Sequence, residues 1–346
     1  RITMTEKYNV AIMGATGAVG QVMMEILAER SFPLDELRLL ASARSVGRQI
    51  EFRDESIEVR ELKEDSFTGI DIVLASAGGS LSKQFNPHAV AAGAVVVDNT
   101  SAYRMDPQVP LVVPEINPGD LQAHQGIIAN PNCSTIIMDV VVWPLYQRCK
   151  VKRIVVSTYQ AVSGAGARAM EELEQQTRQV LAGEDTAPVE LPHQIAFNLF
   201  SHNSDIGPEG YCEEEMKMIR ETHKMFHDDE LQVTATTIRV PVMRAHSEAI
   251  NLEFAEVFSA DDARDILAEA PGVTIVDEAE QNHFPMPIEA SGLDDVLVGR
   301  IRQDISRPEG TGLDLWVSGD QLRKGAALNT VQIAEALIEG NLLKSA

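Results

Sequence analysis

The chain has 346 residues, 44% of them apolar and 23% charged, a composition typical of a globular protein long enough for two domains. Its 29 basic and 52 acidic residues give a formal net charge of −23, which argues against nucleic acid or an anionic membrane surface as a partner. No apolar run approaches the ~18 residues of a membrane span, so we expect neither a membrane anchor nor a signal peptide. Three cysteines make no disulfide framework, and we expect a reducing cytoplasm.

The first predicted elements are a short buried strand over residues 8–13, a glycine-rich turn over 14–20 and a helix over 21–30. Glycines let the backbone approach a pyrophosphate closely, and the N-terminus of the helix receives its charge. The spacing G-x-x-G-x-x-G departs from the standard G-x-G-x-x-G, so a plain strand-to-helix turn remains the alternative. The candidate cofactor contacts in this turn are Gly14, Thr16, Gly17, Ala18 and Val19.

The second predicted strand, near residues 37–41, should end at the adenosine ribose of a bound dinucleotide. An NAD-binding chain carries an acidic residue there, whereas this chain has Arg44 flanked by Ser42 and Ser45. An arginine with hydroxyls suits a 2′-phosphate, so Arg44 and Ser45 favour NADP over NAD. A solvated surface arginine is the alternative.

Further alternation of strands and helices follows in the first third of the chain. Strands are predicted over residues 57–62, 70–77 and 94–98, with a helix through 89–92 and a small-residue turn over 75–80. This order predicts a doubly wound α/β domain that binds its ligand at the carboxyl ends of its strands.

The stretch Asn-Pro-Asn-Cys-Ser-Thr over residues 130–135 lies between a predicted buried strand, 126–129, and a predicted helix, 136–145. Pro131 disfavours helix at Asn130, so the helix should begin near Asn132 or Cys133. Backbone N–H groups and the helix dipole stabilise a thiolate at that position, where a cysteine pKa of ~8.5 can fall to ~7 or below. An inert buried cysteine is the alternative.

The pattern changes after this helix. Helices are predicted over residues 167–181, 211–227 and 325–343, and strands over 151–162, 231–242, 248–257, 296–305 and 313–318. Long strands late in the chain predict a second, α+β domain with a mostly antiparallel sheet.

A thiolate in a chain with a dinucleotide-binding fold indicates hydride transfer through a thioester, which needs a general acid or base. His246, seven residues after Arg239 and just beyond a predicted strand end, is the candidate, although a lone histidine is more often structural. His223 and His227 lack the glutamate of H-E-x-x-H and a third ligand, so no metal site is predicted.

Three stretches, residues 14–20, 130–135 and 239–246, resemble aspartate-β-semialdehyde dehydrogenases of the bacterial type, and the resemblance runs in order from Tyr8 to the closing helix. It implies a Rossmann-like NADP-binding domain over 1–131, completed by 327–346, and a catalytic and dimerisation domain over 132–326. The last helix then returns to the first domain. A homodimer through the sheet of the second domain is implied, and a tetramer stays possible.

The resemblance also implies the reaction. NADPH reduces L-aspartyl 4-phosphate to L-aspartate 4-semialdehyde with release of phosphate, in lysine and diaminopimelate, threonine, methionine and isoleucine biosynthesis. Cys133 is then the nucleophile that forms the thioester, His246 the general acid/base, and Gln160 the residue that orients the substrate.

Further roles follow from the same resemblance. Arg104 and Lys217 would bind phosphate, and Arg239 would bind the α-carboxylate through a bidentate guanidinium. Asn132 and Glu214 are implied to contact the substrate, and Glu214 would hold the amine of the substrate. The implied cofactor contacts are Ser163, Gly164 and Asn329. The alternatives are a solvated Glu214–Lys217 ion pair, a surface charge at Arg104 and a helix cap at Asn329.

Rival readings remain within the same chemistry. N-acetyl-γ-glutamyl-phosphate reductase and glyceraldehyde-3-phosphate dehydrogenase share the thioester, but the former has its cysteine in Gly-Cys-Tyr-Pro-Thr, which this chain lacks. Malonyl-CoA reductase uses the same scaffold and the same kind of cysteine and stays open. An inactive paralogue would have lost Cys133, His246 or Arg239, and all three are present.

Overall fold

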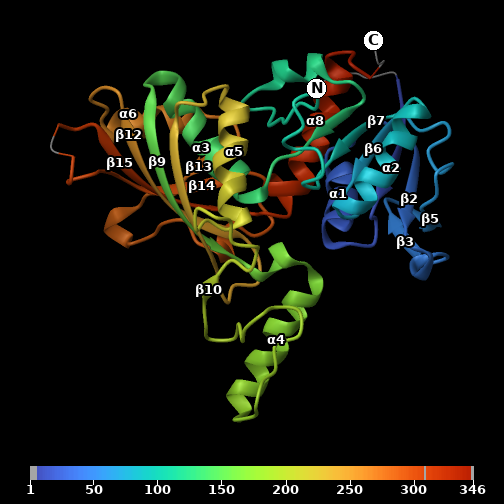
Figure 1. Cartoon of the computed structure of the whole chain (residues 1–346), viewed down its shortest axis with the longest axis horizontal. Coiled ribbons are helices and arrows are strands. Elements are labelled where there is room, and N and C mark those ends of the chain that lie inside the picture. Colours follow the sequence, from blue (N-terminus) through green and yellow to red (C-terminus); the bar gives the residue numbers. More distant parts are fainter. Residues whose placement is uncertain (1–5, 308, 344–346) are drawn as a thin grey trace. The chain divides into compact units, whose positions relative to one another are not determined.

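A computed structural model describes residues 6–307 and 309–343 and divides the chain into two units (Figure 1). The first unit comprises Arg1–Asn132 and Ala326–Ala346, and the second comprises Cys133–Gly325. In the ranges that the structure describes, every helix is too short or too polar to cross a bilayer.

The first unit is built on a six-stranded parallel sheet with the order β5-β2-β1-β6-β7-β8. Its strands are β1 (Tyr8–Met13), β2 (Leu34–Ala41), β5 (Arg60–Glu61), β6 (Ile72–Ala75), β7 (Val95–Asp98) and β8 (Ile127–Ala129). The strand order changes direction between β1 and β6, where doubly wound sheets bind their ligands. The predicted doubly wound fold is confirmed.

One predicted strand of the first unit is wrong. Residues 57–62 form two strands, because β4 (Glu55–Glu58) pairs antiparallel with β3 (Gln49–Phe52) whereas β5 pairs with β2. Val59, which is fully buried, separates them, and its N–H donates to the carbonyl of Arg48. The chain therefore changes partner within two residues.

In its described residues the first unit has three α-helices: α1 (Ala18–Glu29), α2 (Gly79–Ala91) and α8 (Leu328–Glu339). A five-residue π-helical turn, Arg323–Ala327, precedes α8. Val331, Ile333 and Leu337 of α8 are fully buried, and α8 packs on α1. At the end of α1, Arg30 forms two hydrogen bonds of 2.8 and 2.7 Å with the carboxylate of Glu335. The closing helix returns to the first domain, as predicted.

The second unit is built on a seven-stranded mixed sheet with the order β10-β11-β9-β12-β15-β14-β13. Its strands are β9 (Val151–Gln160), β10 (Phe200–Ser201), β11 (Gln232–Arg239), β12 (His246–Phe254), β13 (Val273–Ile275), β14 (Val296–Gln303) and β15 (Gly312–Gly319). Among the described strand pairings of this second sheet, only β9–β11 and β13–β14 are parallel. The sheet is therefore mostly antiparallel, as predicted.

Helices cover one face of this sheet: α3 (Cys133–Arg148), α5 (Glu213–Phe226) and α6 (Ala260–Ala268). Alternate residues of β12, such as Ile250 and Leu252, face the helices and are buried. Ala249 and Asn251 point to the other face and stay partly exposed. The period-two pattern of the strand thus separates a core face from a face that remains partly open.

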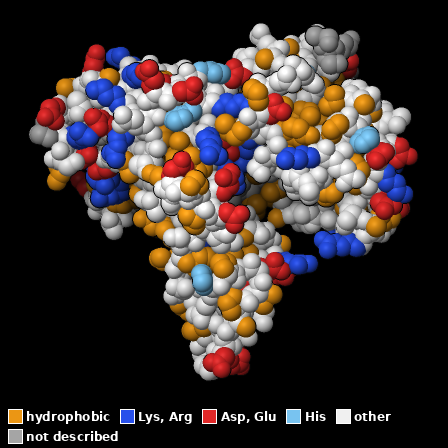
Figure 2. Space-filling model, viewed as in Figure 1, with side chains coloured by type: hydrophobic (Ala, Val, Ile, Leu, Met, Phe, Trp, Pro, Cys, Tyr) orange, Lys and Arg blue, Asp and Glu red, His pale blue; other side chains and the backbone are white. Residues whose placement is uncertain are grey.

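The segment after α4 (Ala167–Ala182) is fixed to that helix by two buried side chains. The carboxylate of Glu172 accepts backbone N–H groups of residues 189–191 at 2.8 to 3.0 Å, and Gln176 accepts the N–H of Ile195 at 2.8 Å. Figure 2 shows hydrophobic side chains spread over this part of the second unit, which Figure 1 labels α4. Three exposed ones are Leu181, Val189 and Phe197.

Two carboxyl groups are buried between α3 and the sheet. Asp139 accepts the hydroxyl of Thr222 at 3.0 and 3.2 Å, whereas neither oxygen of Glu248 has a hydrogen-bond partner among the described residues. Burial raises the pKa of both carboxyls well above the usual range, with a further rise at Glu248 from Asp139 and at Asp139 from Glu221. Glu248 is therefore held as the neutral acid.

Glu248→Gln tests this assignment. A raised pKa in the folded state leaves stability intact below the unfolded pKa and removes it as pH rises. The wild type should therefore lose stability relative to the variant as pH rises above the unfolded pKa of ~4.3, by at most about 1.4 kcal/mol per pH unit. Denaturant unfolding of both proteins at increasing pH measures the difference. A difference that does not change with pH contradicts a neutral Glu248.

Candidate active site

The glycine turn of the first unit joins β1 to α1. Gly14 has a φ of 94°, and a Cβ there would lie 2.5 Å from the carbonyl oxygen of Ser76. A Cβ on Gly20 would lie 2.4 Å from the carbonyl oxygen of Gly14. The helix begins at Ala18 with Gly17 as its N-cap, without a side-chain cap and without an acidic residue in the first turn. The turn therefore fits a pyrophosphate group.

Arg44 and Ser45 form a short 3-10 turn, η1 (Ala43–Ser45), directly after β2. Arg44 is exposed and Ser45 is half-buried. Since β2 is the neighbour of β1 in the sheet, this turn follows the strand where a ribose 2′-group is bound in doubly wound folds.

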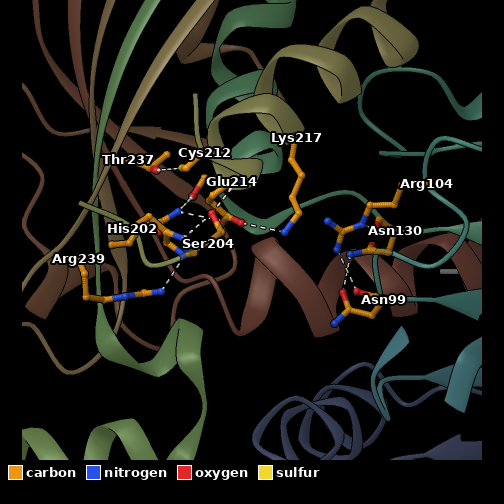
Figure 3. A network of polar contacts seen from close by, with 12 residues as sticks. Asn99, Arg104, Asn130, His202, Ser204, Cys212, Glu214, Lys217, Thr237 and Arg239 are labelled. Carbon is orange, nitrogen blue, oxygen red and sulfur yellow. Dashed lines mark hydrogen bonds and ion pairs between the residues drawn. The ribbon is translucent and has the colours of Figure 1, made fainter. Parts of the chain in front are cut away.

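Arg104 is held by backbone carbonyls of the first unit (Figure 3). Its Nε donates to the carbonyl of Asn130 at 2.9 Å and its Nη2 to that of Asn99 at 3.1 Å. These two backbone carbonyls orient the guanidinium of Arg104. Asn329 is fully buried and donates to the Asn130 side chain at 2.7 Å and to the carbonyl of Val112 at 3.0 Å.

Cys133 is the first residue of α3, as the position of Pro131 predicts. Its side chain is half-buried, and a Cβ on Gly325 would lie 2.9 Å from the Cβ of Cys133. The chain at Gly325 therefore passes against the cysteine in a way that only a glycine allows. The geometry presents a thiol at a helix N-terminus, where a thiolate is stabilised.

His246 is buried, and its Nδ1 accepts the backbone N–H of Ala161 at 3.0 Å. Burial, and then the charge of Arg239, lower the pKa of His246 to about 3. The ring is therefore neutral near pH 7 and carries its hydrogen on Nε2. A Cβ on Gly164 would lie 3.1 Å from this Nε2 and 3.2 Å from Nη1 of Arg239. In this state the Nε2–H of His246 is a hydrogen-bond donor.

The prediction that His246 lies just beyond a strand end is wrong. His246 opens β12 and pairs with Gly319 of β15. Ala245, in the connection between β11 and β12, has a φ of 70° and donates its N–H to Gln321 at 2.9 Å. A non-local contact therefore sets where β12 begins.

Arg239 is the last residue of β11 and is 3% exposed. Its Nη1 donates to the carbonyl of Ala161 at 2.7 Å and its Nη2 to Nε2 of His202 at 3.0 Å. Its Nε–H is buried without an acceptor in the described part of the chain. Burial lowers the pKa of Arg239, and the charges of Cys133 and Glu214 act in the opposite direction. A buried donor without an acceptor, close to the thiolate, suits a ligand carboxylate.

Gln160, the last residue of β9, connects α3 with α5. Its Nε2 donates to the hydroxyl of Ser134 at 2.6 Å and approaches Glu214 Oε1 at 3.3 Å, whereas its buried Oε1 has no partner among the described residues. Lys217 donates to Glu214 Oε2 at 3.0 Å, across one turn of α5. The second unit therefore brings these residues together with Cys133, Arg239 and His246.

Sequence reasoning missed three polar residues of the second unit: His202, Ser204 and Gln321. Gln321 donates to the hydroxyl of Ser163, which is buried in the 3-10 turn η3 (Val162–Ala165) beside Gly164. His202 and Ser204 follow β10, a strand of two residues, in a stretch without hydrophobic periodicity. No local pattern marks them.

No cluster of metal-ligating side chains is present in the portion of the chain that the structure describes. His223 is 2.7 Å from the carbonyl oxygen of Leu231, and His227 ends α5 with a φ of 52°. Both histidines therefore have structural positions on α5.

A glycine turn that fits a pyrophosphate on a parallel sheet and a cysteine at a helix N-terminus close to a buried arginine are features of nicotinamide-dependent oxidoreductases. The family model "Semialdehyde dehydrogenase, NAD binding domain" matches residues 9–124, and "Semialdehyde dehydrogenase, dimerisation domain" matches 142–324. The aspartate-semialdehyde dehydrogenase of Synechocystis sp. is 58% identical over 336 residues, 97% of this chain and 99% of the relative.

Other relatives agree. The aspartate-semialdehyde dehydrogenase of Aquifex aeolicus is 51% identical over 97% of this chain and 99% of the relative. A crystal structure of aspartate semialdehyde dehydrogenase II from Vibrio cholerae, complexed with ASA, superposes with a TM-score of 0.94 at 45% identity, covering 97% of this chain and 99% of that chain. The chain belongs to the aspartate-semialdehyde dehydrogenase family.

Gly164→Ala tests the packing of the site. The added Cβ would meet His246 Cε1 at 3.0 Å and Arg239 Nη1 at 3.2 Å, so both side chains must move. We expect kcat/KM for the family reaction to fall by up to about 100-fold, which is the loss that a misplacement of about 1 Å can cause. Gly119→Ala is the control, since its Cβ meets nothing within 4 Å. Equal activity of the two variants would contradict the described geometry.

Proposed function

We propose that this chain reduces L-aspartyl 4-phosphate to L-aspartate 4-semialdehyde with release of phosphate, in the biosynthesis of lysine, diaminopimelate, threonine, methionine and isoleucine. The observation that carries the proposal is the cluster of Cys133, His246 and Arg239 in the second unit of a chain of this family. Each of these residues offers the chemistry that one part of the substrate requires.

The proposed reaction starts at Cys133. Its thiolate attacks the acyl carbon, the carbon–oxygen bond to phosphate breaks, and inorganic phosphate leaves a thioester on the sulfur. NADPH, when bound, supplies a hydride to the thioester carbon. The Nε2–H of the neutral His246 ring donates a hydrogen bond to the carbonyl oxygen as negative charge develops there, and collapse of the resulting thiohemiacetal anion releases the aldehyde and the thiolate.

Substrate recognition is proposed for the polar groups around the thiol. The buried Nε–H of Arg239 lacks an acceptor, which supports it as the site of the α-carboxylate. Glu214 binds the amine, and the buried Oε1 of Gln160, which lacks a partner, supports Gln160 as an orienting residue. Lys217 and Arg104 bind phosphate, and Asn132, beside the nucleophile, completes the set of substrate-binding residues.

The cofactor is proposed to be NADP. The turn that contains Gly14, Thr16, Gly17, Ala18 and Val19 has no room for a side chain at Gly14, which suits a pyrophosphate. Arg44 and Ser45 supply a cation and a hydroxyl for the 2′-phosphate after β2. Ser163, Gly164 and Asn329 are the further proposed cofactor residues.

A homodimer is proposed, with the roles of the two domains as the resemblance implies: residues 1–131 with 327–346 for NADP, and 132–326 for catalysis and dimerisation. Support comes from the partly open sheet face that carries Ala249 and Asn251 and from exposed apolar side chains beside α4. We propose a cytoplasmic location, consistent with the small number of cysteines.

The reaction is tested in reverse by following NADP⁺ reduction with L-aspartate semialdehyde, with and without inorganic phosphate. We expect turnover that requires phosphate, and we expect Cys133→Ser to lower kcat on the order of 10³-fold or more, because a hydroxyl is not ionised at neutral pH. Turnover only with malonyl-CoA and NADPH would instead assign the chain to an acyl-CoA reductase.

Arg44→Glu tests the cofactor. We expect the KM for NADP⁺ to rise on the order of 10- to 100-fold, since a carboxylate replaces the cation beside the 2′-phosphate, while the KM for NAD⁺ falls. Arg48→Glu makes the same change in charge at an exposed arginine four residues away and is the control. Equal use of NAD⁺ and NADP⁺ by the wild type would refute the assignment of NADP.

A further inference from the structure

Three hydrogen bonds run in series from Arg239 to the first turn of α5 (Figure 3). Arg239 Nη2 is 3.0 Å from His202 Nε2, His202 Nδ1 is 3.1 Å from Ser204 Oγ, and Ser204 Oγ accepts the backbone N–H of Glu214 at 3.1 Å. A guanidinium only donates hydrogen bonds, so His202 Nε2 must be the acceptor. The ring hydrogen then lies on Nδ1 and is donated to Ser204 Oγ, so the approach of the Ser204 backbone N–H to Nδ1 at 3.2 Å is not a hydrogen bond in this tautomer.

The ring of His202 is neutral in this arrangement. Burial lowers its pKa to about 4, with Arg239 and Lys217 acting in the same direction and Glu214 and Glu215 opposing them. A neutral ring can accept from Arg239, whereas a protonated ring would place a second donor and a like charge against the guanidinium. The bond from Arg239 to His202 therefore persists at neutral pH.

The backbone around His202 is fixed by the sheet. Phe200 of β10 pairs with Arg239 of β11, and the N–H of His202 donates to the carbonyl of Thr237 at 2.9 Å. His202 therefore has a defined position relative to the end of β11. The His202 ring therefore reaches the Arg239 guanidinium from a backbone position that the sheet fixes.

The first turn of α5 is tied to the same strand by a second path. Glu215 accepts the N–H of Thr237 at 3.0 Å and the N–H of Cys212 at 2.8 Å. Because Glu215 already anchors α5 to β11, the bonds from Arg239 through His202 to Ser204 are not needed to hold the helix. Their consequence is local, since they set the guanidinium of Arg239 relative to Glu214.

We propose that His202 is a positioning residue that fixes Arg239 toward the substrate carboxylate and links it, through Ser204, to the helix turn that bears Glu214. This inference rests on the proposed roles of Arg239 and Glu214. One chain of hydrogen bonds then positions both Arg239, which binds the α-carboxylate of the substrate, and Glu214, which binds its amine. Loss of His202 weakens recognition of the carboxylate and leaves the thiol chemistry unchanged.

Two substitutions separate the two bonds of the ring. His202→Gln places an amide oxygen near the position of Nε2 and keeps an acceptor for Arg239. His202→Asn places an amide nitrogen near the position of Nδ1, which keeps the donor to Ser204 and removes the acceptor. His193→Asn is the matched control, because His193 is exposed and its ring only contacts Phe200 edge-on.

The experiment compares L-aspartate semialdehyde with 3-aminopropanal, which lacks the α-carboxylate, in phosphate-dependent NADP⁺ reduction. We expect His202→Asn to raise the KM for the semialdehyde on the order of 10- to 100-fold, with kcat changed less than about threefold. Its kcat/KM for 3-aminopropanal should equal that of the wild type. His202→Gln should recover most of the loss, and His193→Asn should match the wild type.

Three results would overturn the inference. Both His202 variants could keep the wild-type KM, or both substrates could lose kcat/KM equally, which would indicate a purely structural role. A wild type without phosphate-dependent turnover of the semialdehyde would overturn the proposed function and this inference together. If the wild type is active and both His202 variants keep its KM for the semialdehyde, the inference is overturned while the proposed function stands. Circular dichroism and the rate of Cys133 alkylation report whether each variant keeps its fold and its thiol.

Discussion

The second unit buries a guanidinium without giving it a carboxylate partner within ion-pair distance in the described residues, and the rest of the site depends on this arrangement. The Ala161 carbonyl and the His202 ring satisfy part of the hydrogen-bonding capacity of Arg239 but carry no charge, and the charges of Cys133 and Glu214 offset its burial only in part. A buried cation is costly unless it is paired, so the site has a strong preference for an anion. The same charge helps to keep His246 neutral and favours the thiolate of Cys133.

The backbone of Ala161 coordinates these side chains. Its carbonyl accepts from Arg239 and its N–H donates to His246, so the peptide groups next to the end of β9 orient both side chains together. Gln160, the preceding residue, contacts Ser134 and Glu214. The residues proposed to bind the carboxylate, to act on the carbonyl oxygen and to bind the amine thus all contact one strand end, where parallel pairing with β11 fixes the register.

The elements that sequence alone predicted well are those with local signals. The glycine turn, the start of α3 at Cys133 and the apolar strands of the first unit follow from glycine spacing, from Pro131 and from hydrophobic runs. The errors have non-local causes. The strand predicted over 57–62 divides because its halves pair with different strands, and His246 joins β12 because it pairs with Gly319. His202 was missed because β10, only two residues long, is specified by its pairing with β11.

The placement of α8 has a consequence for how the chain is made. The first unit takes its last helix from the C-terminal end of the chain, while the whole second unit intervenes. During synthesis the apolar surface of α1 that receives α8 therefore stays uncovered until the whole second unit and residues 328–339 have left the ribosome. The second unit is contiguous and can form its core earlier. Completion of the first unit is the final event, so chains that terminate early expose an apolar surface that chaperones and proteases can recognise.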